Sequence, residues 1–395
     1  MNEPRQLKVL LVDPSLFTAP YDAALTQGLL HAGVTPTWAV RPTRPADRQE
    51  LPQERSEALF YGWIDRQTQL SPKLRAVGKG FAHAFGLAKL VQRALQLRPD
   101  VVHFQWLVVP PLDSAAMLLL RLFCPLVVTA HDTVPYNGDR MSFLQRWGFD
   151  LPLRLSDRII VHTRAGHAAL LSRGVPHDKL RIIAHGALPL SASPSESARS
   201  LGNDAVYRFV VFGELKSYKG LDVLVEALGL IPVAVRNKLR VIVAGRPRMA
   251  LEPLVARIAE LGLSEVLELR PQRQSEQEMA DLFAAADCFL FPYRQIDASG
   301  VYFLVKALGK WLIASRVGIF AEELREGEQG ELVPAGDASA LARAMISALE
   351  TRRAARPVAL GTDWTEIGEA TRELYRDARA SRRRSSRHVP AGAST

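Results

Sequence analysis

The sequence predicts an α/β protein made of two doubly wound domains, and two observations carry this prediction. Short apolar runs alternate with helix-forming segments along most of the chain, which is the pattern of a parallel sheet covered by helices. The pattern stops at residues 191–204 (SASPSESARSLGND) and then restarts, as expected of a linker between two domains. With 395 residues, the chain is long enough to build two such cores.

The first half is expected to form six buried strands, each a short apolar run. They fall at residues 7–12, 34–40, 101–105, 126–130, 158–161 and 181–184. Helices are expected at 21–31 and 165–173, with further helical segments running to residue 97. Residues 41–56 are polar and contain three prolines, so they are interpreted as a surface loop.

The second half repeats the alternation, with strands expected at residues 209–212, 239–244, 266–269, 288–291, 311–314 and 331–333. We therefore expect a first domain at 1–190, a linker at 191–204 and a second domain at 205–360. An amphipathic helix at 361–378 is expected to pack back on the first domain. The basic end at 379–395 is expected to be disordered.

Charge is distributed unevenly along a chain whose net charge is +9. Residues 66–99 contain seven lysines and arginines and no acidic residue, with apolar residues interspersed. This basic amphipathic stretch suits an anionic membrane surface, and a solvated helix face is the alternative. No run is apolar over the ~18 residues that a membrane-spanning helix needs, and no secretory signal is recognised, which predicts a cytoplasmic protein.

Three glycine-bearing strand ends in the second half are candidate phosphate-binding loops. The first is FGELKSYKG at 212–220, where Gly213 frees the backbone and Lys216 and Lys219 follow before a helix. The second carries Arg246 after a strand, and the third carries Arg294 and then Ser299-Gly300 at a helix start. Lysines, arginines and free amides at helix N-termini suit a diphosphate. Each loop alone is also compatible with an ordinary strand-to-helix turn.

Histidines mark the strand ends of the first half. His131, followed by Asp132, ends a central strand and is the best functional candidate, whereas His103, His162 and His185 are more typical of positioning residues. No cluster has the spacing of metal ligands, so no metal is expected. The absence of a Gly-x-Ser-x-Gly motif disfavours a serine hydrolase. The absence of a Gly-x-Gly-x-x-Gly motif after the first strand disfavours a dinucleotide oxidoreductase.

With these segments assembled, the chain resembles the family 4 (group 1) retaining glycosyltransferases of the GT-B fold over nearly its whole length. The matching motifs are PDVVHFQW at 99–106, TAHD at 129–132, DRIIVHT at 157–163 with His185-Gly186, the segment 212–227 and the segment 286–322. The resemblance implies two Rossmann-like domains that face each other across a cleft. It also implies a sugar-nucleotide donor on the second domain and an acceptor on the first.

The resemblance assigns roles to individual residues. It implies catalytic roles for His131, Lys219 and Lys216, and acceptor-binding or positioning roles for His103, Asp132 and His185. The implied donor-binding residues are Gly213, Arg246, Arg294, Ser299, Gly300, Val301 and Glu322. Many family members carry two glutamates where this chain has Ile296 and Leu304. The chain instead resembles a branch with PYR…SGV in that segment, and Glu214 stands where an arginine is usual.

The sequence thus predicts a retaining glycosyltransferase that uses a nucleoside-diphosphate sugar and needs no cofactor. Its acceptor is expected to be a lipid-linked or growing cell-surface saccharide, reached at the inner face of the cell membrane through residues 66–99. A GT-B sugar-nucleotide epimerase and a catalytically inactive sugar-nucleotide-binding assembly protein are the alternatives. Specific nucleic-acid binding is not expected, because no aromatic platform accompanies the basic tail.

Overall fold

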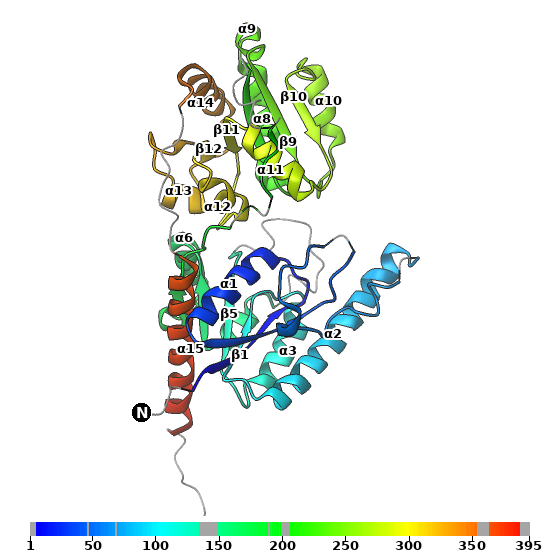
Figure 1. Ribbon diagram of the computed structural model, residues 1–395, viewed down its shortest axis with the longest axis vertical. Coiled ribbons are helices and arrows are strands. Elements are labelled where there is room, and N and C mark those ends of the chain that lie inside the picture. Colours follow the sequence, from blue (N-terminus) through cyan, green and yellow to red (C-terminus); the bar gives the residue numbers. More distant parts are fainter. Residues whose placement is uncertain are drawn as a thin grey trace, which may run out of the picture. The chain divides into compact units, whose positions relative to one another are not determined.

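The computed structural model describes residues 5–45, 47–67, 69–133, 148–188, 190, 192–196, 198, 206–353 and 363–387. The described chain separates into two compact units (Figure 1). Unit 1 comprises residues 5–133, 148–186 and 363–387, and unit 2 comprises the described residues from 187 to 353. Most of the expected linker, 191–204, lies outside the described residues.

Unit 1 is built on a parallel sheet of seven strands in the order β3-β2-β1-β4-β5-β6-β7. The strands are β1 (Leu7–Asp13), β2 (Val34–Val40), β3 (Ser56–Ala58), β4 (Val101–Phe104), β5 (Leu126–Ala130), β6 (Arg158–Val161) and β7 (Leu180–Ile182). The chain runs outward in one direction from β1 and in the other from β4, so the topological switch point lies between these two strands. Ligands of open α/β sheets bind at such a point, outside the carboxyl ends of the strands.

Helices cover both faces of this sheet. Alternate side chains of β1 point to opposite faces, so Leu11 packs in one core with α1 (Ala19–His31) and α15 (Trp364–Arg387), and Val12 packs in the other. The second core includes α2 (Pro72–Leu97) and α3 (Pro110–Leu120). The remaining helices are α5 (Leu151–Leu155), α6 (Arg164–Ser172), η1 (Gln53–Arg55) and η3 (His177–Lys179).

The C-terminal helix α15 packs on unit 1 through glycines that let two backbones approach. A Cβ on Gly28 of α1 would lie 2.0 Å from Trp364 O, and one on Gly368 would lie 2.1 Å from Gly28 O. Any larger residue at either position would force the helices apart. Leu374 and Tyr375 are buried on the same side of α15.

The expectation of a disordered tail from residue 379 is wrong for residues 379–387, which continue α15. Two arginines explain why the helix extends. Arg379 pairs with Asp100 at 3.0 Å, and Arg382 donates to Cys124 O on the edge of the sheet. Asp100 and Cys124 belong to the folded part of unit 1, so these two contacts stabilise the basic segment as a continuation of the helix. Residues 388–395 lie outside the described residues.

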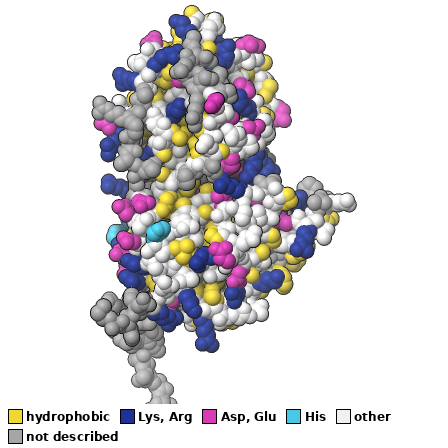
Figure 2. Space-filling model, viewed as in Figure 1, with side chains coloured by type: hydrophobic (Ala, Val, Ile, Leu, Met, Phe, Trp, Pro, Cys, Tyr) yellow, Lys and Arg dark blue, Asp and Glu magenta, His cyan; other side chains and the backbone are white. Residues whose placement is uncertain are grey.

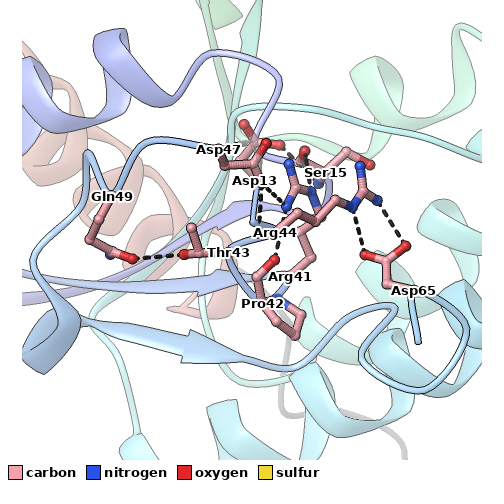
Figure 3. A network of polar contacts seen from close by, with 9 residues as sticks. All are labelled: Asp13, Ser15, Arg41, Pro42, Thr43, Arg44, Asp47, Gln49 and Asp65. Carbon is pink, nitrogen blue, oxygen red and sulfur yellow. Dashed lines mark hydrogen bonds and ion pairs between the residues drawn. The ribbon is translucent and has the colours of Figure 1, made fainter.

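The segment 41–56, expected to be a surface loop, is largely irregular and exposed, and Arg41 anchors its start to the loop after β1 (Figure 3). Arg41 is only 5% exposed. Its guanidinium donates to Ser15 O at 2.9 Å and to Asp47 at 2.5 Å, and Arg44 pairs with Asp65 at 2.9 Å. The segment also ends in the short strand β3, which the sequence reading missed because its residues Ser-Glu-Ala have no apolar pattern.

Unit 2 contains a parallel sheet of six strands in the order β10-β9-β8-β11-β12-β13. The strands are β8 (Tyr207–Phe212), β9 (Leu239–Ala244), β10 (Leu267–Arg270), β11 (Cys288–Phe291), β12 (Trp311–Ser315) and β13 (Gly330–Val333). The switch point of this sheet lies between β8 and β11. Each strand ends close to where the sequence pattern places it.

Two cores lie on opposite faces of this second sheet. Phe209 and Val211 pack with α8 (Leu221–Leu230), α10 (Glu252–Glu260) and α14 (Ala338–Thr351). Val210 packs on the other face with α11 (Glu276–Ala285), α12 (Gly300–Lys306) and α13 (Gly318–Glu323). The short helices α9 (Val233–Arg236) and η4 (Ser217–Lys219) complete the unit.

Candidate active site

The switch point of unit 2 brings two of the predicted loops together. The loop after β8, residues 213–220, and the loop after β11, residues 292–299, both leave the carboxyl edge of the sheet there. A Cβ on Gly220 would lie 2.0 Å from Pro292 O, so the two backbones touch. The Arg294 amide donates to Tyr218 O at 2.7 Å. This bond ties the loops into one surface.

Lys219 is the functional group that this surface buries, with only 4% of the residue exposed. Its Nζ donates to Phe212 O at 2.9 Å and lies 5.3 Å from the centre of the Tyr293 ring. A Cβ on Gly213, whose φ is 100°, would lie 2.8 Å from this Nζ and 3.1 Å from the Val301 side chain. Three predicted site residues, Gly213, Lys219 and Val301, therefore meet at one point.

The Lys219 ammonium has no carboxylate as an ion-pair partner among the residues that the structure describes. Burial lowers the pKa of Lys219 to about 7; Glu214 raises it and Lys216 lowers it further. A buried lysine of this kind gains its full charge when an anion arrives beside it. The site is therefore suited to bind an anionic group and to take up a proton as it does so.

The start of α12 adds backbone donors next to this lysine. Ser299 is the N-cap residue, and its Oγ accepts from the Tyr302 amide at 3.3 Å. The first amides of a helix have no partner within the helix. Gly300 is exposed, and a Cβ there would meet nothing within 4 Å. Open space thus lies at Gly300, directly before Val301.

Lys216 lies on the same loop but shares its acidic neighbour with a second cation. Its Nζ is 3.8 Å from Glu214, and Arg248 pairs with the same carboxylate at 2.6 Å. Glu214, which departs from the family pattern, thus holds two basic side chains beside the loop. The predicted catalytic role of Lys216 stays a prediction.

The other predicted donor-binding side chains lie at the rim of unit 2. Arg294 forms two hydrogen bonds with Asp222 on α8, at 2.7 and 2.5 Å, and this pairing lowers the pKa of Asp222. Its guanidinium is therefore held by a carboxylate, which the sequence did not indicate. Arg246 and Glu322 are exposed, at the end of β9 and on α13. Their contacts with a donor stay predictions.

At the carboxyl edge of unit 1, three histidines line up after three neighbouring strands. His131 follows β5, His162 follows β6 and His185 follows β7. His131 Nδ1 lies 3.2 Å from His162 Nε2, and His162 Nδ1 lies 3.0 Å from Ile183 O. Because a carbonyl only accepts, His162 Nδ1 carries a proton. Tyr21 packs against all three rings, with centroids 5.0, 5.5 and 4.9 Å away.

The imidazoles of His131 and His185 are uncharged near neutral pH. Burial lowers the pKa of His131 well below its usual range, and the neighbouring His162 and His185 lower it further. Burial likewise lowers the pKa of His185 to about 3. His131 therefore offers no positive charge, and both of its ring nitrogens have partners within unit 1: Nε2 lies 3.1 Å from Gln105 Oε1 and Nδ1 lies 3.2 Å from His162 Nε2. Asp132, directly after it, is half-buried, and its predicted role near an acceptor stays a prediction.

His103 positions other elements and does not face a ligand. The residue is fully buried, and its two ring nitrogens lie 2.8 Å from Tyr375 Oη on α15 and 2.8 Å from Thr129 Oγ1 on β5. Both nitrogens are thus used within unit 1. Of the two roles open to His103 in the sequence, the structure supports positioning.

Two aromatic residues that sequence reasoning left without a role extend the row of histidines. The Trp106 ring stacks on His131 with centroids 5.0 Å apart and planes 12° apart, and its Nε1 donates to Thr18 Oγ1 at 2.9 Å. The Phe17 ring lies 5.2 Å from Trp106 and is 56% exposed. Both follow strands at the switch point, β1 and β4. In the sequence, the position of an aromatic residue shortly after an expected strand could have indicated that these two residues belong to the site.

A pair of buried carboxyl groups lies next to the carboxyl edge of unit 1. Asp13, at the end of β1, and Asp22, on α1, are both fully buried. Burial raises the pKa of Asp13 to about 6 and raises that of Asp22 well above its usual range, and a hydrogen bond joins the two carboxyl groups. Asp22 therefore carries the proton and donates a hydrogen bond to the Asp13 carboxylate. That carboxylate also accepts hydrogen bonds from the Ser15 and Thr18 amides.

Among the described residues, no group of three or more His, Cys, Asp or Glu side chains is placed to hold a metal ion. No described helix combines the length and the apolar character needed to cross a bilayer.

Comparison with known families matches each unit separately. Residues 23–187 match the family described as Glycosyltransferase Family 4, and residues 207–351 match Glycosyl transferases group 1. Among solved structures, Anabaena HepE in complex with UDP and glucose has a TM-score of 0.67 at 18% identity, covering 97% of this chain and 99% of that one. The catalytic domain of Arabidopsis thaliana starch synthase IV, bound to ADP and acarbose, has a TM-score of 0.70 at 11% identity, covering 95% and 100%.

The chain has the GT-B fold. It carries a family 4 glycosyltransferase domain in unit 1 and a group 1 glycosyltransferase domain in unit 2. This confirms the predicted fold class. The narrower assignment to a PYR…SGV branch stays a prediction.

Curated relatives of this GT-B protein include a D-inositol 3-phosphate glycosyltransferase of Acidothermus cellulolyticus. The two are 29% identical over 249 residues, which is 58% of this chain and 55% of the relative. A protein of the same name from Streptomyces avermitilis is 28% identical over 58% of this chain and 51% of its own length. The chain thus spans about half the length of the curated relatives it matches.

Proposed function

We propose that this GT-B protein is a retaining glycosyltransferase that uses a nucleoside-diphosphate sugar as donor. The observation that carries the proposal is the buried ammonium of Lys219 at the switch point of unit 2, next to Gly213 and Val301. A leaving diphosphate gains negative charge as the bond to the sugar breaks. A cation already positioned in a site that excludes water stabilises that charge most strongly.

The donor diphosphate is proposed to lie over Gly213 and the start of α12. Lys219 contributes the charge, and the amides of Gly300 and Val301 contribute hydrogen bonds, as helix N-termini do for phosphates. Lys216 is proposed as a second cation, replacing the usual arginine of the loop. Ser299 supports the amides from its N-cap position. No metal or other cofactor takes part in this proposal.

The transfer step is proposed to proceed on one face of the sugar. The bond between the anomeric carbon and the diphosphate oxygen breaks, and the acceptor hydroxyl oxygen bonds to the same carbon. A donor phosphate oxygen takes the acceptor proton, so no protein nucleophile is required. The products are a glycoside with the donor's anomeric configuration and a nucleoside diphosphate.

The acceptor is proposed to bind at the carboxyl edge of unit 1. His131 and Trp106 there form an uncharged, stacked surface, which suits the apolar face of a sugar ring. The acceptor is therefore proposed to be a saccharide, lipid-linked or part of a growing cell-surface polysaccharide. A phosphorylated cyclitol, suggested by the names of the curated relatives, is the competing acceptor class.

The membrane is proposed as the place of this reaction, on its inner face. A lipid-linked acceptor is confined there, and residues 66–99 carry no acidic residue. Specific nucleic-acid binding is not part of the proposal.

A donor panel tests the proposal. UDP-, GDP- and ADP-sugars are screened by thermal shift, because a ligand that binds the folded state raises its apparent stability. The stabilising donor is then incubated with saccharide acceptors and with D-inositol 3-phosphate, and the product is analysed by NMR. We expect one donor class, a saccharide product and retained anomeric configuration. An inverted product, or transfer to the inositol phosphate alone, contradicts the corresponding part of the proposal.

The same assay separates the two alternatives. An epimerase changes the donor sugar without any acceptor, so NMR of the donor alone detects it. An inactive assembly protein stabilises with a donor but gives neither transfer nor hydrolysis. The second alternative is motivated by Ile296 and Leu304 in place of glutamates. Ile296 is only 8% exposed and belongs to the apolar core of unit 2, so this position now serves packing.

A further inference from the structure

The outer face of α2 is apolar although it faces solvent. Leu74, Val77, Phe81 and Phe85 are 61%, 59%, 70% and 55% exposed. Their spacing of three, four and four residues places them on one stripe of the helix. Figure 2 shows hydrophobic and basic side chains interspersed over the part of unit 1 where α2 runs in Figure 1.

The opposite face of α2 is fixed, so the stripe cannot turn inward. A Cβ on Gly86 would lie 2.3 Å from the Phe60 ring, which leaves no room for the helix to shift. On the same buried side, His83 lies 2.8 Å from Tyr61 Oη and 2.8 Å from Asp113 on α3. Rotation of α2 would bury apolar side chains only by breaking these hydrogen bonds in the core.

The neighbouring helix carries further exposed apolar side chains. Helix α3 packs beside α2, and the side chains at its end and in the following turn are also exposed. Of the seventeen large apolar side chains that are exposed in the described chain, nine lie on α2, on α3 or directly after α3. They are Leu74, Val77, Phe81, Phe85, Leu95, Leu118, Leu119, Leu122 and Phe123. Exposed apolar side chains that are concentrated in this way indicate an interaction surface, whereas single exposed apolar residues are common on any protein.

The charges around the stripe indicate what covers it. Helical spacing places Lys73 on one flank of the stripe and Lys89 on the other, and Lys89 Nζ lies 4.7 Å from the centre of the Phe85 ring. No acidic residue occurs among residues 66–99. A second copy docked on the same face would bring two acid-free, basic surfaces together, which is unfavourable. An anionic surface is complementary.

We propose that α2 and the turn after α3 form a membrane-docking face that lies on a bilayer with anionic headgroups. The stripe enters the boundary between headgroups and acyl chains, with Phe81 and Phe85 deepest. Lys73 and Lys89 contact lipid phosphates from either side. A helix of this composition lies in the plane of the interface. The inference deepens the proposed function by naming the surface and the partner, and its test does not depend on transfer.

Vesicle flotation of the full chain tests the docking face. Vesicles of phosphatidylcholine with about 30% phosphatidylglycerol should carry the protein upward at low salt, and pure phosphatidylcholine vesicles should carry much less. Raising the salt to about 0.5 M should weaken binding, because the Debye length falls to a few ångströms. Absence of flotation on the anionic vesicles overturns the proposal.

Two variants locate the binding face. The pair Phe81→Ser and Phe85→Ser is expected to reduce binding by at least ~10-fold, since each removes an inserted ring. The matched control is the pair Leu230→Ser and Val233→Ser on unit 2, where the exposed fractions are 57% and 61%. The control pair should bind like the unaltered protein. Equal loss in both pairs, or no loss in the phenylalanine pair, overturns the proposal.

A charge variant and a mass measurement cover the remaining outcomes. If the phenylalanine pair does not fold, the pair Lys73→Gln and Lys89→Gln should still lower binding at low salt and have little effect at high salt. Light scattering without vesicles should give a monomer. A dimer that Phe81→Ser dissociates would assign the stripe to a second copy and contradict membrane docking. Transfer to a water-soluble acceptor should be unchanged in all variants, which separates this proposal from the proposed activity.

Discussion

The carboxyl edges of the two sheets have the same topology and opposite electrostatics. Each sheet has a switch point beside its first strand, β1 in unit 1 and β8 in unit 2. The edge of unit 2 buries one lysine that has no carboxylate partner among the described residues. The edge of unit 1 buries imidazoles whose pKa values lie below their usual range, so they are uncharged near neutral pH.

The difference supports the proposal that the two units bind different kinds of ligand. A leaving diphosphate needs a cation, and a desolvated lysine becomes fully charged when the anion is present. An uncharged sugar ring needs no cation, and the stacked rings of His131 and Trp106 form an uncharged aromatic surface on which such a ring can pack. The proposed division into donor and acceptor units follows from this contrast.

The largest expected effect comes from removing the buried ammonium of Lys219. Lys219→Ala should lower the transfer rate by at least ~100-fold, the loss expected when a positioned charge-stabilising group is removed. Transfer kinetics with the donor found by the panel measure it. The matched control is Arg248→Ala, a basic residue on the neighbouring loop that is paired with Glu214; it should lose only a few-fold. Similar losses in both variants would mean that the buried position of Lys219 has no special role.

A smaller effect should appear when the uncharged edge is altered. Trp106→Ala removes the ring stacked on His131 and should raise the acceptor KM about threefold to tenfold, given the usual strength of aromatic contacts. Donor affinity should not change. Phe17→Ala, which removes the more exposed ring, should give a weaker effect of the same kind. A lowered donor affinity in Trp106→Ala, with acceptor KM unchanged, would contradict the assignment of unit 1 to the acceptor.

The buried carboxyl pair of unit 1 predicts a pH dependence of stability rather than of transfer. Folding raises the pKa of Asp13 to about 6 and that of Asp22 further, so the folded state binds more protons than the unfolded state. The contribution of this carboxyl pair to the unfolding free energy of unit 1 should therefore fall as the pH rises from about 4 through 6 and beyond. The fall should amount to a few kcal/mol, at roughly 1.4 kcal/mol per pKa unit. The buried His103, His131 and His185, whose pKa values are lowered, contribute in the opposite direction as the pH rises toward the usual pKa of histidine, so the pair is isolated by comparing variants.

Asp22→Asn tests the cause of that dependence. The asparagine amide can donate to the Asp13 carboxylate without holding an ionisable proton. Between pH 5 and pH 8 the unfolding free energy of the variant should therefore fall less, or rise more, than that of the unaltered protein, because the histidine contribution is the same in both. Urea unfolding at pH 5 and pH 8, followed by tryptophan fluorescence, measures it. Asp178→Asn, on the exposed surface of unit 1, is the control and should keep the original profile. A steeper fall in Asp22→Asn would show that the carboxyl pair does not share a proton.

Local patterns in the sequence predicted most of the fold. Every strand expected from an apolar run occurs in the structure within two residues of its expected bounds, because parallel strands buried on both faces need such runs. Strand β3 was missed, since its three residues lie at an edge and need no apolar pattern. The extension of α15 past residue 378 was missed because it depends on Asp100 and Cys124, distant in sequence.

The candidate site was only partly predictable for the same reason. Gly213, Lys219 and Val301 could be picked from their motifs, and the structure brings them together. The burial of Lys219 could not be read from the sequence, because it is created by a different loop that contributes Tyr293. The pairing of Arg294 with Asp222 likewise joins residues 72 positions apart.

The central claim is that Lys219 becomes charged when a diphosphate binds beside it, and calorimetry measures this directly. Binding of the preferred nucleoside diphosphate is followed at pH 8.5 in two buffers with different ionisation enthalpies. Because burial lowers the pKa of Lys219 to about 7, the free protein holds almost no proton there, and binding should take up about one. Lys219→Met should bind weakly and take up none. Binding of the unaltered protein without proton uptake, or equal uptake in Lys219→Met, would contradict the account.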